Sequence, residues 1–208
     1  MPRISPAEFS ALPLRANSLL ADVPLHDVWA VDLPGLREGV TLEEVLRRAD
    51  RDVFAPRDAK MRGLRAAARA LFRLRLLLGR LFRLEHEPDD AEAASFATRL
   101  TAEDRARSSV VSGTRAGNFH VVYRFENEQL LEVHNRTVHA AALSAVAKTG
   151  DGYRYYFAVY VVSVGWITPL YMALIDPFRR WIIYAALLRN IRAGIGSAVA
   201  GQPSTPML

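Results

Sequence analysis

The chain has 208 residues, of which 50% are hydrophobic and 24% are charged, a balance typical of globular proteins that excludes wholesale disorder. It contains no cysteine, which excludes disulfides, thiolate metal sites and a cysteine nucleophile and fits a reducing compartment. The net charge is +5, an excess too small to indicate a nucleic-acid partner, and we expect none. Nine basic residues and one acid lie within residues 57–83, so the rest of the chain is nearly balanced in charge.

The first part of the chain predicts an irregular segment, a strand and a helix. Residues 1–24 contain four prolines and are expected to form an irregular lead-in. Residues 25–33 predict a first strand, which a Pro-Gly pair ends. Thr41 and Glu44 then match a capping box, so we expect a helix that ends near Ala49.

Residues 56–84 give the clearest helix signal in the chain. Apolar residues recur there at steps of three and four and form one stripe, namely Leu64, Ala67, Leu71, Leu74, Leu78 and Leu81. Most of the arginines lie off this stripe, among them Arg62, Arg65, Arg69, Arg73 and Arg80. Two interpretations stay open for this basic amphipathic helix: it packs on the domain with a solvated arginine face, or it contacts an anionic membrane surface or a partner.

The second half predicts antiparallel strands after a short capped helix at residues 102–107. Residues 119–126 alternate apolar and polar side chains, and residues 130–135 return after a tight polar turn. Residues 137–147 continue extended, and a Thr-Gly-Asp-Gly turn leads into residues 153–164, which are apolar on both faces and so are expected to be covered. Links as short as hairpins require antiparallel pairing.

Residues 155–175 form a run of 21 residues without a charge, and length and hydropathy alone fit a transmembrane helix. The first part of the run is aromatic or β-branched, however, which favours a buried strand. Gly165 permits a turn, and Thr168 with Pro169 has the form of a helix cap followed by proline. We therefore predict a strand, a turn and a short helix. Residues 1–20 lack the pattern of a secretory signal, so the expected location is the cytoplasm.

A second cap-plus-proline pair, Asp176 and Pro177, predicts a long C-terminal helix over residues 178–192. The elements together predict an α+β fold in which a curved antiparallel sheet grips this helix, with the basic amphipathic helix as an addition in the N-terminal half. We expect one domain over residues 25–193, followed by a flexible tail over 194–208. The space between a curved sheet and a gripped helix is a common place for a ligand.

Three segments of the second half resemble a bacterial family known as domain of unknown function 2867. They read FHVVYRFENE from residue 119, NRTVHA from residue 135 and YMALIDPFRR from residue 171, and residues 74–75 and 78–82 resemble the helical region of the family. The resemblance covers roughly residues 25–193. It implies the helix-grip (SRPBCC) superfamily, which includes START lipid-binding domains and polyketide cyclases, and it brings no established activity. About six strands are expected here, whereas a helix-grip sheet usually has seven.

The leading hypothesis is a protein that binds a small hydrophobic or amphipathic molecule between sheet and C-terminal helix. The candidate lining residues are Tyr123, Phe125, His139, Tyr155, Phe157, Trp181 and Tyr184. An aromatic cluster of this kind either packs the core or lines a pocket. Two alternatives stay open: an enzyme of the cyclase or isomerase kind that uses His139 or a tyrosine as acid or base, and a peripheral membrane or partner-binding protein that acts through residues 57–83.

The remaining polar candidates carry no catalytic motif. His134 and His139 would lie on opposite faces of a continuous strand, and the histidine spacing matches no zinc motif, so no metal is expected. The sequence holds neither G-x-S-x-G nor a phosphate loop, and no cofactor is expected. Arg179 and Arg180 at a helix start oppose the helix dipole, which implies an ion pair with Asp176 or an anionic ligand.

Overall fold

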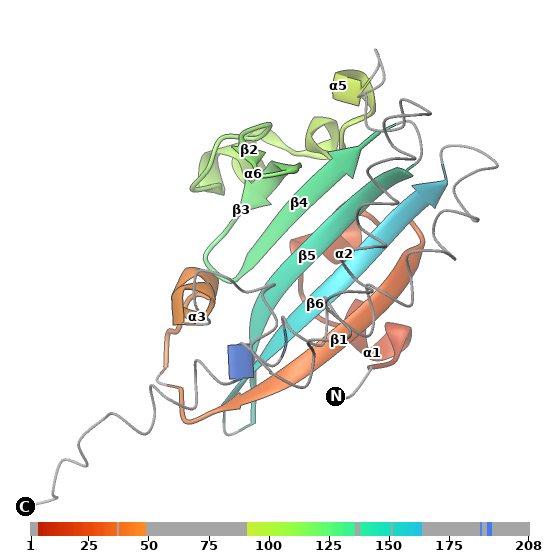
Figure 1. Cartoon of the computed structure of the whole chain (residues 1–208). Coiled ribbons are helices and arrows are strands. Elements are labelled where there is room, and N and C mark those ends of the chain that lie inside the picture. The colour runs from red at the N-terminus through yellow and green to blue at the C-terminus, as the bar shows by residue number, and fades with distance from the viewer. Residues whose placement is uncertain are drawn as a thin grey trace, which may run out of the picture.

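The architecture is an antiparallel sheet with short helices, seen in a computed structural model (Figure 1). The model describes residues 4–36, 38–48, 91–135, 138–150, 152–163, 188 and 191–192. The helices are α1 (Pro6–Ser10), α2 (Arg15–Leu19), α3 (Leu42–Arg48), α5 (Ala91–Ala94), the 3-10 helix η2 (Phe96–Arg99) and α6 (Ala102–Arg107). The strands are β1 (Leu25–Pro34), β2 (Arg115–Ala116), β3 (Phe119–Arg124), β4 (Glu128–His134), β5 (Val138–Thr149) and β6 (Gly152–Ser163).

The six strands form one sheet in the order β1-β6-β5-β4-β3-β2, and all neighbours are antiparallel. Strands β2 to β6 follow one another as a meander, because each is joined to the next by a short link. The first strand, β1, pairs with the last, β6, and so the beginning of the chain closes one edge of the sheet. The predicted α+β class with an antiparallel sheet is confirmed.

One face of the sheet, the helix-covered face, carries α1 and α2 (Figure 1). A row of apolar side chains runs across it from β1 to β3, one residue from each of these five strands: Val28, Ala158, Leu143, Leu130 and Tyr123. Phe9 of α1 is fully buried in the same cluster, and its ring centroid lies 6.2 Å from that of Tyr156. The N-terminal helices are therefore part of the core.

The opposite face is also apolar along β1 and β6. Its buried cluster consists of Val31, Leu33, Val40, Leu42, Val45, Val146, Tyr155, Phe157, Val159, Val161, Leu188 and Ile191. Side chains of β6 alternate between the two faces, so this strand is apolar on both, as its sequence predicts. Leu188 and Ile191 belong to the segment for which a C-terminal helix is expected, and both are fully buried here. The rest of that segment, like the basic helix at 57–83, lies outside the described residues.

The structure corrects the expectation for residues 1–24, since α1 and α2 occupy much of this segment. Ser5 caps α1 by accepting a hydrogen bond from the amide of Glu8 at 3.1 Å, and Pro6 takes the first helical position. The proline that suggested irregular structure is thus a helix-starting residue.

The uncharged run at residues 155–175 begins as the strand predicted for it, because β6 extends to Ser163. The remainder of the run lies outside the described residues. None of the helices in the described part of the chain is long and apolar enough to cross a membrane.

Replacing Leu143 by alanine should test the core of the helix-covered face. Leu143 is fully buried between Leu130 and Ala158, so we expect the free energy of unfolding to fall by about 2–5 kcal/mol. Urea unfolding should show a lower midpoint with an unchanged slope. Val111→Ala is the control, since Val111 is 79% exposed and should change stability by less than about 0.5 kcal/mol. Equal effects of the two substitutions would contradict this packing.

Candidate functional site

Strand β4 turns charged side chains toward the helix-covered face. Alternate residues of the strand lie on that face, and their cross-strand partners on β5 are Ala145 for Glu128, Leu143 for Leu130, Ala141 for Glu132 and His139 for His134. Glu128 is only 2% exposed and Glu132 only 4%. Burying a carboxylate is costly unless hydrogen bonds replace its water, so the partners of these two groups decide their role.

Glu128 caps the start of α2. Its Oε1 accepts a hydrogen bond from the Arg15 amide at 2.7 Å, and its Oε2 accepts from the Ala16 amide at 3.4 Å and from the Tyr123 hydroxyl at 3.0 Å. Leu14, the N-cap residue of α2, has an apolar side chain that cannot accept hydrogen bonds from these amides. Burial raises the pKa of Glu128, and these hydrogen bonds offset only part of the effect.

Arg15 also joins α2 to α6. Its guanidinium group contacts the Asp104 carboxylate through Nε at 2.9 and 3.1 Å and through a terminal nitrogen at 2.7 Å. Asp104 is the capping-box acid of α6, exchanging hydrogen bonds with Thr101 as the sequence predicts. The Arg15 hydrogen bonds are the main reason that the pKa of Asp104 is lowered to about 2.

Glu132 caps the start of η2 in the same way. It accepts hydrogen bonds from the Ser95 hydroxyl, from the Phe96 amide at 2.9 Å and from His139 Nε2 at 3.3 Å. Ser95 itself accepts from the Ala97 amide at 3.1 Å, so hydroxyl and carboxylate together satisfy this helix start. Burial acts to raise the pKa of Glu132, but the hydrogen bonds from His139, Ser95 and Phe96 outweigh it and the pKa is lowered.

His139 is held in a closed environment. Its ring stacks between those of Phe96 at 4.0 Å and His134 at 4.3 Å, and the residue is 6% exposed. The expectation that His134 and His139 face opposite ways is wrong, because they lie on two strands and pair directly across them. His120 pairs with Glu132. In the described ranges, no group of three or more His, Asp or Glu side chains is arranged to hold a metal ion.

The sheet separates the residues predicted to line one ligand cavity. Tyr123, Phe125 and His139 lie on the helix-covered face, and the Tyr123 and Phe125 rings stack at 4.3 Å. Tyr155 and Phe157 lie on the opposite face. The other predicted site residues lie outside the described part of the chain: Trp181, Tyr184, Asp176, Arg179, Arg180 and the basic-helix residues Arg62, Arg65, Arg69, Arg73 and Arg80.

Tyr155 carries the polar group of the opposite face. Its hydroxyl lies 2.9 Å from the Ser144 hydroxyl, and burial raises its pKa. This hydroxyl pair sits among the apolar side chains of β6 and next to the cluster that includes Leu188 and Ile191. The ligand-binding role of these residues stays a prediction.

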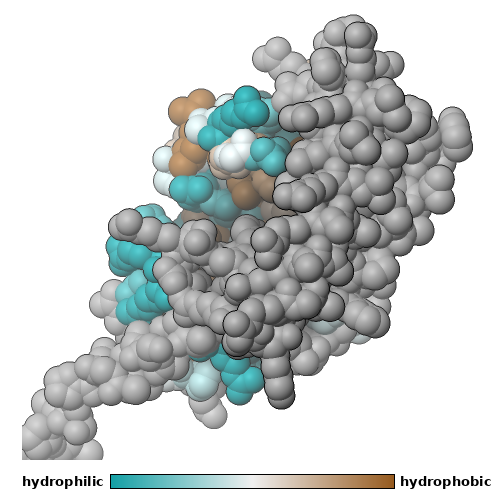
Figure 2. Space-filling model, in the orientation of Figure 1, coloured by the Kyte–Doolittle hydropathy of each residue, from teal (hydrophilic) through white to brown (hydrophobic). Residues whose placement is uncertain are grey.

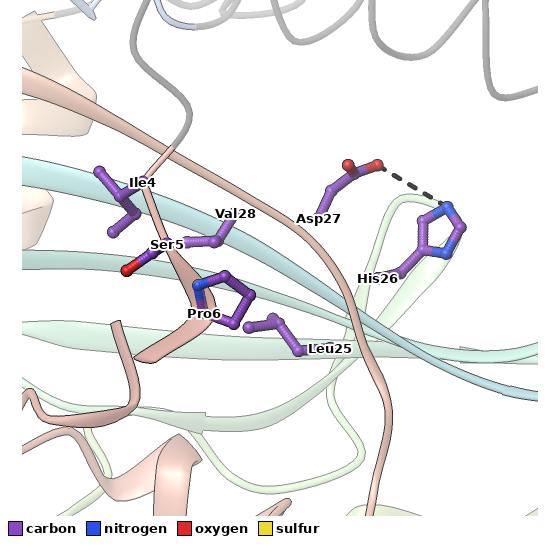
Figure 3. Close-up of a pocket in the computed structure, with 7 residues that line it drawn as sticks. All are labelled: Ile4, Ser5, Pro6, Leu25, His26, Asp27 and Val28. Atoms are coloured by element: carbon purple, nitrogen blue, oxygen red, sulfur yellow. Dashed lines mark ion pairs between the residues drawn. The ribbon is translucent and has the colours of Figure 1, made fainter. Parts of the chain in front are cut away.

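A pocket of about 390 Å³ lies at the start of β1 (Figure 3). Two segments line it, residues 4–6 and residues 25–28. Ile4, Pro6, Leu25 and Val28 supply apolar surface, and His26 and Asp27 supply polar groups, with His26 Nε2 3.7 Å from Asp27 Oδ2. A register shift between Leu25 and Asp27 interrupts the pairing of β1 with β6 at this point. Sequence reasoning missed this site, and its one local signal was the adjacent His26-Asp27 pair at the start of a largely apolar strand.

The comparisons with known proteins give one match. A family model described as "Protein of unknown function (DUF2867)" matches residues 19–186, which is more than half of the chain. No curated protein and no solved structure matches at a significant level. The resemblance read from the second half of the sequence is thereby confirmed.

The two β4 glutamates should respond to pH in opposite ways. Glu132→Gln should lower the free energy of unfolding at neutral pH by about 1.5–3 kcal/mol, because a charged acceptor is lost while the shape is kept. The lowered pKa of Glu132 means that the wild-type advantage exists above the usual glutamate pKa and disappears as the pH falls through the lowered one.

Glu128→Gln is the matched comparison. The raised pKa of Glu128 means that the folded wild-type protein loses stability as the pH rises above the usual glutamate range, so the glutamine variant should gain relative to wild type over that window. Urea unfolding of the three proteins from about pH 2.5 to pH 8 measures both trends. Parallel pH profiles of the two variants would show that the glutamates do not differ as described.

Proposed function

We propose that this chain, which belongs to the DUF2867 family of proteins of unknown function, binds a small hydrophobic or amphipathic molecule, with the pocket at the start of β1 as the binding site. The observation that carries the proposal is the combination, in one hollow, of an apolar wall with an imidazole and a carboxylate. Its size of about 390 Å³ falls within the range of roughly 300–1,000 Å³ that is usual for small-molecule sites.

The polar end of the pocket supports an oriented ligand. The His26 side chain is 27% exposed, whereas the Asp27 side chain beside it is fully buried. A ligand would therefore contact the imidazole and not the carboxylate. The two side chains lie 3.7 Å apart, which puts a basic and an acidic group close together among the residues that line the pocket. In this proposal a polar head group would lie near His26 and Asp27, and its apolar body would lie against Leu25, Val28 and Ile4.

The finer fold assignment also belongs to the proposal. We place the chain in the helix-grip superfamily, and the burial of Leu188 and Ile191 against β6 supports it, because a gripped C-terminal helix would occupy this face. In that arrangement Tyr155, Phe157 and Ser144 form a second apolar surface with one hydroxyl pair, suited to the same class of ligand. The enzymatic role of His139 stays a prediction, since its described neighbours are those of a structural residue.

Filling the pocket tests the proposal. Leu25→Trp should occupy the hollow and weaken binding of the amphipathic dye 1-anilinonaphthalene-8-sulfonate at least tenfold, while His26→Ala should weaken it about fivefold through the lost polar contact. Native mass spectrometry of freshly purified protein should show a copurifying small molecule in the wild type that Leu25→Trp lacks.

Leu12→Trp is the control, because Leu12 is a half-buried leucine of the N-terminal segment that lines neither this pocket nor the opposite face. Urea unfolding of all variants confirms that they are folded before binding is compared. Equal dye affinity and equal copurified mass in folded wild type and Leu25→Trp would show that the pocket is not the binding site.

A further inference from the structure

The segment at residues 108–114, which we call the docking loop, joins α6 to β2 and is fixed along β3. The amide of Ser109 donates to the Arg124 carbonyl and that of Gly113 donates to the Val121 carbonyl, both at 2.8 Å. The Ser112 hydroxyl donates to the Val122 carbonyl at 2.7 Å. Because hydrogen bonds hold the loop along its length, its side chains have set directions.

The docking loop presents a hydrophobic side chain to solvent. Val111 is 79% exposed, and it is the exposed large hydrophobic residue of the described part of the chain. The anchored residues Ser109, Ser112 and Gly113 lie around it, so Val111 cannot turn inward without breaking hydrogen bonds to β3. An exposed single valine needs no explanation by itself. The arginines around Val111 are a second feature that indicates a contact surface.

Residues 105–124 hold four arginines and no acidic residue, in a chain with 22 acids. Arg105, Arg107 and Arg115 are exposed, and in the described structure none of them contacts a carboxylate. Their guanidinium contacts are the Ala97 carbonyl at 2.7 Å, the Phe125 ring at 4.3 Å and the Gly117 carbonyl at 3.2 Å, respectively. By contrast, Arg15, Arg48, Arg99 and Arg154 each pair with an acid. A guanidinium group has five N–H donors, so most hydrogen-bond donors of Arg105, Arg107 and Arg115 stay available.

The register places these groups in one line. Arg107 lies over Phe125 at one end of β3, and Arg115 pairs with His120 at the other end, which corresponds to a span of about 17 Å along the strand. Val111 lies between them, since its neighbours bond to residues 121–124. In Figure 2 the coloured area over β2, β3 and α6 shows hydrophobic side chains exposed among hydrophilic ones.

We propose that the docking loop, with Arg105, Arg107 and Arg115, is a contact surface for an anionic membrane, in which the arginines bond lipid phosphates and Val111 enters the interface. Guanidinium groups match phosphate oxygens in a bidentate way. An apolar tip between cations suits a lipid interface, where apolar burial and charge act together. A nucleic acid would use the cations but not the valine, and it is the rival outcome of the test. This surface is independent of the β1 pocket.

The test is sedimentation of the full chain with vesicles of phosphatidylcholine alone or of an equimolar mixture with phosphatidylserine. Wild type should bind the anionic vesicles and lose binding in high salt. Arg107→Gln should weaken binding about fivefold, and adding Arg115→Gln should weaken it about fivefold again. Val111→Ser should reduce binding to anionic vesicles without changing its salt dependence. Arg48→Gln, the control, removes one charge from α3 and should bind as wild type.

Three results would overturn the proposal. The first is equal binding to neutral and anionic vesicles. The second is unchanged anionic binding by Arg107→Gln/Arg115→Gln, which would assign membrane contact to another segment. The third is absence of vesicle binding together with fluorescence-anisotropy evidence that a short RNA or DNA duplex binds the wild type and Val111→Ser equally. Urea unfolding before each assay excludes loss of fold as the cause of a change.

Discussion

The arrangement of the helices depends on two carboxylates buried in β4. Each of them must find hydrogen-bond donors inside the protein, because burial removes its water. Glu128 finds them at the start of α2, more than a hundred residues earlier in the chain, and Glu132 finds them at the start of η2. Helix starts carry free amide groups that need acceptors, so each contact satisfies both partners. The sheet thereby fixes where both helical segments lie on its covered face.

The different hydrogen-bond donors explain why the pKa of Glu128 is raised whereas that of Glu132 is lowered. Glu128 meets backbone amides and a phenol, and these contacts do not compensate fully for burial. Glu132 meets an imidazole in addition to a hydroxyl and an amide, and its charged form is the favoured one. His139 is stacked between Phe96 and His134, so the same cluster also ties β5 to η2. The polar groups on this face thus hold helices and strands in place, which accounts for their presence among apolar side chains.

The sequence predicted those features that depend on local pattern. Alternation and turn residues gave β3 to β6, and the capping pair gave α6. Helix α1 is absent from the sequence-based prediction although Ser5 and Pro6 carry the cap-plus-proline signal, because the four prolines of residues 1–24 favour irregular structure. Strand β2 has two residues and no periodicity to detect. The His134–His139 contact depends on the register of β4 against β5, and the β1 pocket depends on how residues 4–6 lie against β1; sequence spacing shows neither.

The positions of the two proposed surfaces follow from how the sheet is filled. Between its edges, the helix-covered face is packed with apolar side chains, and buried carboxylates on it cap helix starts. At the β1 edge, the pairing of β1 with β6 shifts register, and a pocket lies there between residues 4–6 and residues 25–28. At the β2 edge, the docking loop ends the sheet with arginines and an exposed valine. Since the packed helix-covered face has no room for a partner without loss of stability, the proposed β1 pocket and the docking loop lie at the edges of the sheet.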